Sequence, residues 1–532
     1  MKKPNYENYL TTIENRVRSS WKQNAVSNYG ESTSYTFGEM AIEVERVKEW
    51  MRRMGIKKGD KVAICGRSSA HWAIAYLSTV TNGSTAVSIL PDFTPETIQY
   101  LTRHSQAKLL FTGDAVGHKI NGLDFGETIV VNMENWEEQI GEHAYESEDA
   151  FLSRLDWHTG FSLDDLALIN YTSGTTSNPK GVMLTSRSLS SNIDYALHNV
   201  PCGPGDQIVG MLPLAHIFGI IFNYLYPVAG GAHVVFLKQA PTPALLMKAF
   251  ADVKPYLLLT VPLLIEKIIF GKILPVMRKP AIRMMWLSPT LRHIIRDKIH
   301  TQLMNAFGGK MRVLVVGGAA LNPEVENCLR KLHIPYTCGY GMTECGPLVS
   351  YASPGSFKRG SVGRLADNIE LRIRSNDPQN RAGELMVRGD NVCVGYWSNE
   401  EATAQSFDNG WFHTGDMGTV DKYGNITLRG RCKNMILGPS GQNIYPEEIE
   451  AKLQTMPRVA ESVVLSRENA IVALVYPDSE GISREELRIV MGDNLSALNK
   501  WLPKYAQVAK IELVEKEFEK TPKGSIKRFM YK

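Results

Sequence analysis

The sequence predicts an α/β protein: a large, doubly wound N-terminal α/β region followed by a small α+β domain. Three features of the sequence support this prediction. Segments of helical periodicity alternate with short β-type segments between residues 36 and 112, which is the pattern of a parallel sheet with helices on both faces. A chain of 532 residues is too long for one hydrophobic core. Residues 447–514 contain a separate group of helical and β-type segments.

The first predicted helix begins at a capping box formed by Thr36 and Glu39. Its apolar residues recur at helical spacing as far as Met54, and Gly55 ends it. The segments that follow carry no side chains whose chemistry suggests a site, so we interpret them as scaffold. We predict strands at residues 62–65, 85–90 and 109–112, and helices at residues 70–81 and 94–105.

Two longer segments are predicted from composition. Residues 132–165 are acidic and irregular, and we expect a surface connection there. Residues 217–236 form the most apolar run, but Asn223, Pro227 and several glycines interrupt it, which favours a buried helix and strand over a membrane span. In the C-terminal domain we predict helices at residues 447–455 and 483–499, and strands at residues 461–465, 471–475 and 510–514.

The overall composition is that of a soluble globular protein. Hydrophobic residues make up 43% and charged residues 21%, and a net charge of +4 is too small to suggest a nucleic-acid partner. Seven cysteines, an odd number without a CxxC pair, are typical of reduced thiols in the cytosol. The basic N-terminus is not followed by an apolar segment, so we expect a cytoplasmic rather than a secreted protein.

A short loop between Tyr171 and Val182 concentrates hydroxyl side chains, glycine and one lysine. Backbone amides around Gly174 and the hydroxyls can donate to anionic oxygens, and Lys180 adds a mobile charge, so the loop suits a polyphosphate. It is not a Walker A loop, because a glycine follows Lys180 and no glycine stands directly before it. On composition alone, a surface turn rich in Ser, Thr and Gly is an equally good interpretation.

The apolar segment 212–219 contains one histidine, His216. A single histidine in such a segment is usually a core residue. The surrounding stretch, residues 207–251, contains no Asp or Glu. An amino-acid substrate would need a carboxylate to pair with its ammonium group, so a pocket built from this stretch suits an uncharged acyl chain.

Residues 267–310 are basic and apolar together: nine Lys and Arg residues stand among Ile, Leu and Met, with Asp297 as the acidic residue. A solvated helix face is the ordinary interpretation of this pattern. The alternative is a surface that contacts anionic lipid. Pro275, Pro280 and Pro289 exclude one continuous helix.

A candidate nucleotide site is spread over the next hundred residues. A strand predicted at residues 311–316 runs into a glycine pair at 317–318, which permits close backbone approach to a flat ligand. Farther along, Tyr340 can stack on a base, Thr343 can bond a phosphate, and Glu344 can hold Mg²⁺ through oxygen ligation. Each of these signals is weak when taken alone.

Seven strings between Tyr171 and Glu448 are distinctive enough to compare with known motifs. They are Tyr171–Val182, Tyr340–Glu344, Gly383–Gly389 with Gly395–Trp397, Trp411–Asp416, Arg429–Ile436 and Gly438–Glu448. In this order they closely resemble the motifs of the adenylate-forming superfamily, which includes acyl-CoA synthetases, adenylation domains and luciferases. Within the superfamily the chain looks most like bacterial long- or medium-chain fatty acyl-CoA synthetases.

The resemblance implies an adenylate-forming enzyme fold with three parts: an AMP- and acyl-binding domain at residues 1–430, a hinge at 431–434, and a mobile C-terminal domain at 435–532. It implies ATP, Mg²⁺ and the co-substrate coenzyme A. It also assigns roles to individual residues. The catalytic set comprises Lys180, Thr343, Glu344, which is also the metal ligand, and Lys433 at the hinge. The ATP- and AMP-binding set comprises Thr172, Ser173, Gly174, Thr175, Thr176, Gly317, Gly318, Ala319, Gly339, Tyr340, Gly341, Asp416 and Arg431. The acyl pocket comprises His216, Phe218 and Gly219, and a loop on the coenzyme A side contains Gly438 and Gly441.

The chain departs from the superfamily at its C-terminal signature, approximately T-P-x-G-K-I-x-R. Here Ser525 stands where the family has its catalytic lysine. That lysine bridges the carboxylate and the α-phosphate, a developing-charge role that a serine cannot fill. Lys523 and Lys527 would share a face with Ser525 in an extended segment, so either amine is a candidate substitute, with Lys523 the first choice. A solvated basic tail is the alternative interpretation.

The function implied by the resemblance is ATP-dependent activation of a long- or medium-chain fatty acid to an acyl-adenylate, followed by thioester formation with coenzyme A. Alternatives are a fatty acyl-AMP ligase, an acyl–carrier-protein synthetase, and a weakly active nucleotide-binding paralogue. The acid-free stretch disfavours an amino-acid adenylation enzyme. A membrane-dissolved acid would favour peripheral contact of residues Lys267–Lys310 with the inner membrane surface.

Overall fold

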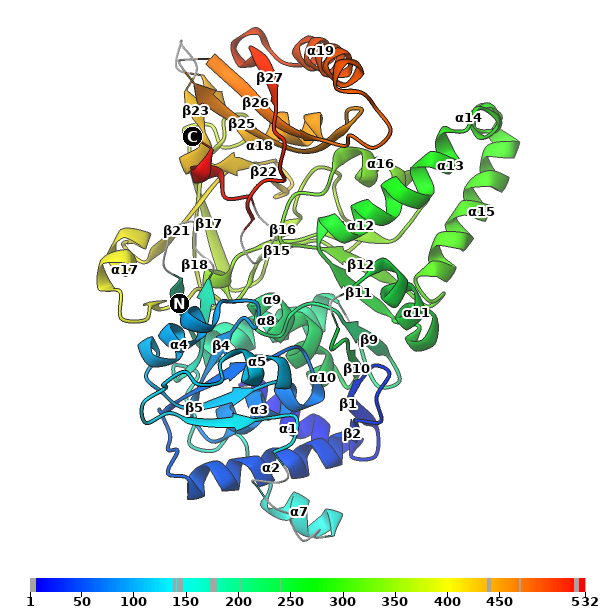
Figure 1. Ribbon diagram of the computed structural model, residues 1–532. Helices are drawn as coiled ribbons and strands as arrows, with labels where there is room; N and C mark the ends of the chain where they lie inside the picture. Colours follow the sequence, from blue (N-terminus) through cyan, green and yellow to red (C-terminus); the bar gives the residue numbers. More distant parts are fainter. Residues whose placement is uncertain are drawn as a thin grey trace.

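The computed structural model describes residues 6–136, 140, 147–172, 179–200, 202–239, 241–437, 442–467, 470–520 and 526–531. A large N-terminal region holds two seven-stranded sheets, and a smaller domain at the C-terminus lies above it in Figure 1. All seven cysteines are free, and five of them are buried.

The first large sheet has the order β19-β8-β7-β4-β3-β5-β6, in which β3 to β7 are parallel, β8 is antiparallel to β7, and β19 is antiparallel to β8. The predicted alternation of strands and helices is confirmed: β3, α3, β4, α4 and β5 follow one another. Their bounds, with those of their neighbours, are α2 Phe37–Arg53, β3 Lys61–Cys65, α3 Ala70–Thr81, β4 Thr85–Ile89, α4 Pro95–His104, β5 Ala107–Thr112, α5 Asp114–Lys119, β6 Ile129–Asn132, β7 Leu166–Thr172, β8 Lys180–Thr185 and β19 Gly395–Tyr396.

Helix boundaries follow the capping residues in the sequence. Thr36 and Glu39 form the predicted reciprocal capping box at the start of α2. Thr185 accepts a hydrogen bond from the backbone N–H of Ser188 and so caps α8, Ser186–Asn199. All twelve residues of α3 are buried, and this helix contacts strands of both large sheets.

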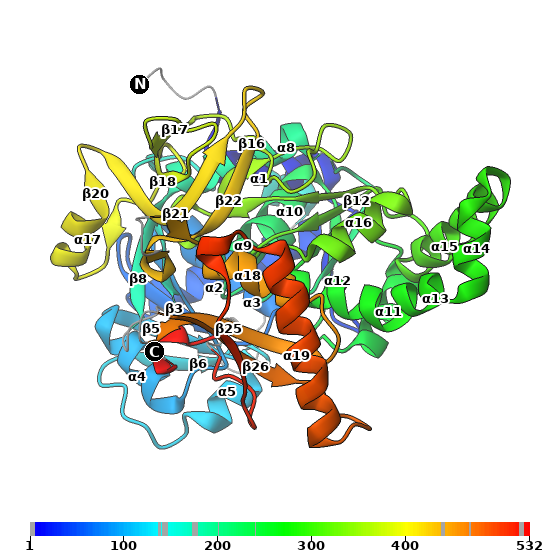
Figure 2. The same cartoon turned by 90° about the horizontal axis from the view of Figure 1, so that it is seen from above.

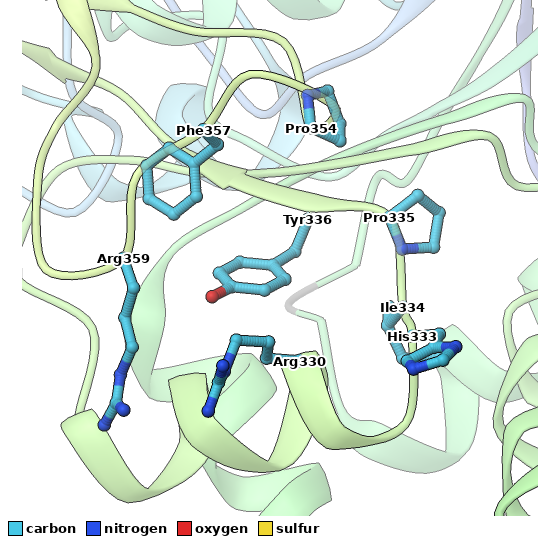
Figure 3. A pocket seen from close by; sticks show the side chains of 8 residues that line it. All are labelled: Arg330, His333, Ile334, Pro335, Tyr336, Pro354, Phe357 and Arg359. Carbon is cyan, nitrogen blue, oxygen red and sulfur yellow. The ribbon is translucent and has the colours of Figure 1, made fainter. Parts of the chain in front are cut away.

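The second large sheet has the order β13-β12-β11-β9-β10-β1-β2, and only β2 is antiparallel to its neighbour. A surface hollow of about 230 Å³ lies beside β13, between Arg330, Tyr336 and Arg359 (Figure 3). The elements of this half are α1 Tyr9–Ser20, β1 Asn24–Asn28, β2 Ser34–Thr36, β9 Gln207–Gly210, β10 His233–Phe236, α11 Pro243–Val253, β11 Leu257–Thr260, β12 Val313–Val316, α16 Pro323–Lys331 and β13 Tyr336–Cys338.

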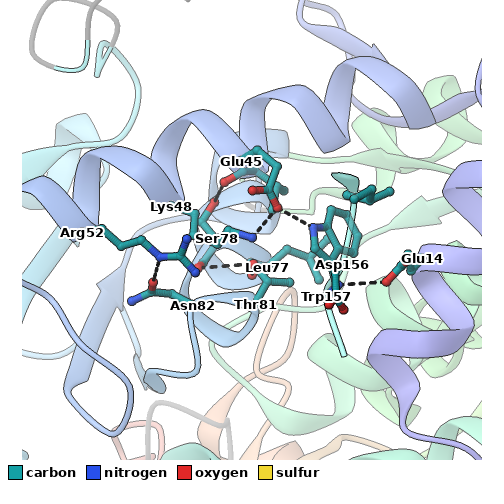
Figure 4. A network of polar contacts seen from close by, with 12 residues as sticks. Glu14, Glu45, Lys48, Arg52, Leu77, Ser78, Thr81, Asn82, Asp156 and Trp157 are labelled. Atoms are coloured by element: carbon teal, nitrogen blue, oxygen red, sulfur yellow. Dashed lines mark hydrogen bonds and ion pairs between the residues drawn. The ribbon is translucent and has the colours of Figure 1, made fainter. Parts of the chain in front are cut away.

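The segment expected to be a surface connection is anchored in the core. Trp136 and Trp157 are fully buried in the cluster that fills the space between the two sheets. The backbone N–H of Trp157 donates to Glu14 at 2.8 Å, and its indole N–H donates to Glu45 at 2.7 Å (Figure 4). Glu45 also pairs with the buried Lys48. The prediction of a surface connection was wrong in this respect. Burial of two large aromatic side chains stabilises the packed segment, although the composition of the segment is acidic.

The apolar run at residues 217–236 forms buried helices and a strand, as predicted: α9 Ile217–Ile220, η1 Ile221–Leu225, α10 Tyr226–Gly230 and β10. Within the described part of the chain, no helix combines the length and the apolar character needed to cross a membrane. Residues 262–306 form consecutive helices that begin at prolines or follow without a break, and their outer part projects from the body (Figures 1 and 2). These helices are α12 Pro262–Ile268, η2 Ile269–Ile273, α13 Leu274–Arg278, α14 Pro280–Leu287 and α15 Pro289–Ala306.

Smaller sheets lie between the large region and the C-terminal domain. They position the residues of the candidate site. Their elements are β14 Tyr340–Gly341, η3 Thr343–Cys345, β15 Leu348–Tyr351, β16 Arg364–Leu365, β17 Ile369–Arg374, β18 Gly383–Gly389, α17 Glu400–Ser406, β20 Phe407–Asp408, β21 Trp411–Val420 and β22 Ile426–Arg431.

The C-terminal domain contains the predicted helices and strands around its own core. Its three-stranded sheet has the order β25-β26-β27. The elements of this domain are η4 Cys432–Asn434, β23 Ile436–Leu437, β24 Asn443–Ile444, α18 Pro446–Leu453, β25 Val459–Arg467, β26 Ala470–Pro477, α19 Arg484–Trp501, η5 Lys504–Ala506, β27 Lys510–Leu513 and η6 Arg528–Met530. Helix α7, Glu148–Arg154, lies in the N-terminal region, in the connection between β6 and β7.

Candidate active site

The predicted phosphate loop connects two antiparallel strands, β7 and β8. Thr172 and Lys180 are backbone partners in this pairing, and the Thr172 hydroxyl donates to the Lys180 carbonyl at 3.4 Å. The pairing fixes both ends of the loop. Four residues predicted to bind phosphate lie outside the described residues: Ser173, Gly174, Thr175 and Thr176.

Lys180, Tyr396 and Glu344 form one connected group. The Lys180 ammonium lies 4.9 Å from the centre of the Tyr396 ring, and the Tyr396 hydroxyl donates to Glu344 Oε1 at 3.0 Å. Strand β19 makes this possible, because it pairs with β8 and places Tyr396 opposite Val182. The sequence analysis assigned no site role to the string Gly395–Trp397, so it missed Tyr396 as a candidate site residue.

Glu344 lies in the 3₁₀ turn η3 and is partly exposed, whereas its neighbour Thr343 is buried. Carboxylate oxygens are the ligands that Mg²⁺ prefers, and Mg²⁺ is commonly held by one or two carboxylates together with substrate phosphates. Among the described residues, the group of three side chains close enough to form a metal cage is Glu14, Asp156 and His158, and it does not include Glu344. The donor set at Glu344 therefore fits a magnesium ion that arrives with a nucleotide.

Asp416 is buried and held from two sides. Its Oδ2 accepts a hydrogen bond from the Tyr340 hydroxyl at 2.5 Å, and its Oδ1 lies 2.8 Å from Arg431 Nε. Asp416 and Arg431 are direct partners in the pairing of β21 with β22. Burial raises the pKa of Asp416 above its ordinary value, while Arg431 opposes that rise. Each carboxylate oxygen keeps a lone pair that can accept a ribose hydroxyl.

Tyr340, which can stack on a base, has a mostly buried ring, and its hydroxyl donates a hydrogen bond to Asp416. Burial and the nearby Asp416 carboxylate raise the Tyr340 pKa. The side chain therefore acts in this structure as a support for Asp416.

Two glycine pairs shape the backbone of the nucleotide site. Gly317 is buried, and a Cβ at this position would lie 3.0 Å from the Phe218 ring. Gly318 has φ of +88°, and Gly318 and Ala319 are exposed. A Cβ on Gly341 would lie 2.2 Å from a backbone oxygen, that of Pro347, whereas Gly339 has more room. Close backbone approach requires glycine at 341, the nearby Phe218 ring favours glycine at 317, and φ favours it at 318.

The predicted acyl segment touches the nucleotide loop through Phe218. Phe218 and His216 are partly exposed, and the Phe218 ring packs against Phe222 with their centres 5.6 Å apart. Gly219 is buried, and a Cβ there would lie 2.1 Å from the Pro213 carbonyl oxygen. Gly219 therefore permits close backbone packing, while His216 and Phe218 remain the side chains available to a substrate.

Lys433, the predicted hinge residue, lies in the turn η4, directly after β22. Two contacts join this region to α18: Asn434 Nδ2 donates to Glu447 at 2.7 Å, and Arg429 pairs with Glu448 at 3.1 Å. The predicted residues Gly438 and Gly441 lie outside the described residues.

The C-terminal signature is described only from Ile526, so Lys523 and Ser525 lie outside the described residues. Lys527 is partly exposed and its ammonium lies 3.4 Å from Glu519 Oε2. The motif's arginine, Arg528, is part of the domain core. It pairs with the buried Glu450 and donates to the Val464 carbonyl at 3.1 Å.

The hollow in Figure 3 is not part of this site. Tyr336 lines it at the start of β13, whereas Tyr340 follows the other end of that strand. Its cations are partly neutralised, because Arg359 lies 3.9 Å from Glu326.

Comparison with known proteins gives two family matches. The model of the "AMP-binding enzyme" family matches residues 13–397, and that of the "AMP-binding enzyme C-terminal domain" matches residues 433–531. Two curated relatives are a 4-coumarate-CoA ligase 1 of Narcissus pseudonarcissus, 27% identical over 93% of this chain and 87% of its own length, and the long-chain-fatty-acid–CoA ligase FadD15 of Mycobacterium bovis, 28% identical over 84% and 78%.

A solved structure with the same fold is the o-succinylbenzoate coenzyme A synthetase (MenE) of Bacillus subtilis in complex with ATP and magnesium ion. It covers 98% of both chains with a TM-score of 0.77 and 23% identity. The predicted fold class, a large α/β region with a smaller C-terminal domain, is confirmed.

Proposed function

Because the chain belongs to the AMP-binding enzyme family and is an AMP-forming acid–thiol ligase, we propose that its acid is a long- or medium-chain fatty acid and its thiol is coenzyme A. The observation that carries this proposal is the acid-free stretch 207–251, which presents Phe218 beside the nucleotide loop at Gly317. An apolar chain can enter such a surface without leaving a charge unpaired.

The first half-reaction joins the acid to the nucleotide. A carboxylate oxygen of the acid attacks the α-phosphorus of ATP, the bond to the bridging oxygen breaks, and pyrophosphate leaves with its electron pair. We propose that the Lys180 ammonium neutralises negative charge on the departing pyrophosphate. Asp416, fixed by Tyr340 and Arg431, would accept the ribose hydroxyls and orient the nucleotide.

Magnesium, held by Glu344, would supply positive charge at the phosphates. Tyr396 fixes one oxygen of Glu344 and leaves the other for the ion. The same tyrosine ring faces the Lys180 ammonium, so one side chain orients both charged groups.

The second half-reaction transfers the acyl group. A thiolate attacks the acyl carbon of the adenylate, and AMP leaves with the electrons of the carbon–oxygen bond. We propose that residues 431–434 act as a hinge between domains 1–430 and 435–532, with Lys433 at its centre, because the two steps need different groups at one site. Gly438 and Gly441 belong to this proposal as the loop on the coenzyme A side.

The relatives do not decide which acid is the substrate, because their names include both 4-coumarate and long-chain fatty acid ligases. The alternative activities are those of a fatty acyl-AMP ligase, an acyl–carrier-protein synthetase and a weakly active paralogue.

We also propose peripheral contact of residues 267–310 with an anionic membrane, because long-chain acids partition into bilayers.

Mass spectrometry of the products tests the proposal. The full chain is incubated with ATP, Mg²⁺ and coenzyme A, with a pool of straight-chain acids from acetate to stearate and with 4-coumaric and benzoic acids. We expect acyl-CoA species from the longer straight-chain acids. Preferential 4-coumaroyl- or benzoyl-CoA would contradict the fatty-acid assignment, and acyl-AMP without acyl-CoA would contradict the coenzyme A assignment.

Three single substitutions test which amine replaces the family's catalytic lysine. If Lys523 is the substitute, Lys523→Ala abolishes acyl-adenylate formation, while Lys527→Ala, which removes a partner of Glu519, lowers it much less. Ser525→Lys is expected to raise the rate by about a hundredfold if serine limits the first step. Pyrophosphate release measures all three rates, and an unchanged rate in Lys523→Ala would remove Lys523 from the catalytic set.

A further inference from the structure

We propose that the arm formed by α13, α14 and α15, residues 274–306, docks on the surface of an anionic lipid bilayer. The arm extends away from the large region in both Figure 1 and Figure 2. No residue of α14 is buried, which is unusual for a helix that contains two methionines, an isoleucine, a leucine and a tryptophan.

The arm has an inner face that anchors it. On α14 the partly buried Ile282, Met285 and Trp286 pack against the main core, and they recur at helical spacing. On α15 the buried residues are Ile295, Ile299 and Leu303. This face accounts for the packing of the arm.

A second set of large apolar side chains points to solvent near the turn between α14 and α15. Met284 is 72% exposed, Leu287 84%, Leu291 42% and Ile294 58%. Four such side chains within eleven residues of sequence are not needed for folding, because the inner face already supplies the buried contacts. They form an apolar surface suited to the boundary between headgroups and acyl chains.

Basic side chains stand close in sequence to these exposed apolar residues. Lys279, Arg283 and Arg292 are exposed and, in the part of the chain that the structure describes, form no ion pair. Asp297, the acidic residue of this region, is already paired with Arg296 at 2.8 Å. Long basic side chains reach toward lipid phosphates while their stems cover apolar surface, so the arm matches an anionic headgroup layer in both charge and polarity.

A second copy of the chain matches the arm less well. A two-fold contact between arms would bring the same cations face to face, which is repulsive. The arm also extends the helix α12, which is next to the candidate site: Glu266 Oε1 accepts a hydrogen bond from the backbone N–H of Asn322 at 2.8 Å. If the proposed fatty-acid function holds, docking brings the acyl site close to a substrate dissolved in the bilayer.

Co-sedimentation of the full chain with large vesicles tests the proposal. One set contains equal amounts of phosphatidylglycerol and phosphatidylcholine, and the other contains phosphatidylcholine alone. We expect binding to the anionic vesicles that decreases as salt is raised, and much weaker binding to the neutral ones. The triple variant Lys279→Gln, Arg283→Gln, Arg292→Gln should bind anionic vesicles about tenfold or more weakly.

Two comparisons make the test specific. The variant Met284→Ser, Leu287→Ser keeps the charge and should also bind more weakly, because insertion of the apolar surface is lost. A control with the same change of charge, Arg488→Gln, Lys500→Gln, Lys504→Gln in the exposed surface of the C-terminal domain, should bind like the wild type.

Several outcomes would overturn the assignment: no binding of the wild type to anionic vesicles, equal binding of the triple variant, or equal loss in the control. The last comparison is light scattering without lipid, which measures the molecular mass of the wild type and of the arm variants. A different mass in the arm variants would mean that this surface contacts a second copy of the chain. Acyl-CoA formation from a water-soluble acid, without vesicles, should be unchanged in the arm variants. That readout separates failure of docking from failure of the proposed activity.

Discussion

Replacing Glu344 with glutamine should lower the rate of acyl-adenylate formation by about a hundredfold to a thousandfold. Glutamine has nearly the same shape and can still accept a hydrogen bond from the Tyr396 hydroxyl, so the local structure should persist. The negative charge is lost, and with it the ligand for the magnesium ion that accompanies ATP. The substitution therefore removes one electrostatic interaction from the site and leaves its geometry in place.

Tyr396→Phe is the matched comparison. It removes the hydrogen bond to Glu344 but keeps the aromatic ring beside Lys180 and the charge of Glu344. We expect a loss of about tenfold, which corresponds to one hydrogen bond to a charged group. Pyrophosphate release as a function of Mg²⁺ concentration distinguishes the two variants. Glu344→Gln should require more Mg²⁺, while Tyr396→Phe should show nearly the wild-type requirement.

The result would contradict our assignment if Glu344→Gln kept wild-type activity and magnesium dependence. It would also contradict the assignment if Tyr396→Phe lowered the rate of acyl-adenylate formation more than Glu344→Gln does. In the second case Tyr396 would act on the substrate directly, and its contact with Glu344 would be incidental.

The sequence predicts the parts of the fold that depend on local patterns. The alternation of β3, α3, β4, α4 and β5 follows from hydrophobic periodicity, and the start of α2 follows from its capping box. The partner of β1 could not be predicted in this way. Strand β1 pairs with β10, and this contact joins Val26 to Val234 across two hundred residues of chain. Local patterns carry no information about such pairing.

The same distinction applies to the candidate site. Lys180, Glu344 and Asp416 stand in motifs that resemble a known family, so they could be proposed from the sequence. Tyr396 contacts Glu344 only because β19 is added to the edge of β8, and Tyr340 supports Asp416 only because the strands that carry them meet. These supporting roles arise from tertiary structure.

Arg528 shows how a motif residue can have a role in stability. Its guanidinium pairs with Glu450 and donates to the carbonyl of Val464, while Glu450 accepts a hydrogen bond from the backbone N–H of Val464 at 2.5 Å. Both charged side chains are mostly buried. Burial raises the pKa of Glu450 to about 8, against the opposing effect of Arg528.

At pH 8.5, where the Glu450 carboxyl is largely ionised in the folded wild type, replacing Arg528 with methionine should destabilise the C-terminal domain by about 3–5 kcal/mol, because Glu450 then remains buried without its cation. Amide hydrogen exchange of β25 and α18 in the full chain measures this change, since it reports opening of one domain within a larger protein. Arg467→Met is the control. It removes the more exposed pair with Glu512 and a hydrogen bond to the Tyr531 carbonyl. We expect this control to lower the free energy of unfolding by about 1 kcal/mol.

The pH dependence gives the Arg528 prediction a second readout. A carboxyl whose pKa is raised in the folded state favours folding when protonated, so its contribution is present at low pH and is lost as the pH rises through about 8. Without Arg528 the Glu450 pKa should rise further. When the pH is lowered from 8.5 to 6, the free energy of unfolding of Arg528→Met should therefore increase more than that of the wild type. Adding Glu450→Gln removes the buried charge while keeping an acceptor for Val464, so the double variant should recover part of the loss and most of its pH dependence should disappear. A pH-independent loss in Arg528→Met, unrelieved by Glu450→Gln, would mean that Arg528 stabilises the domain through packing and not through its charge.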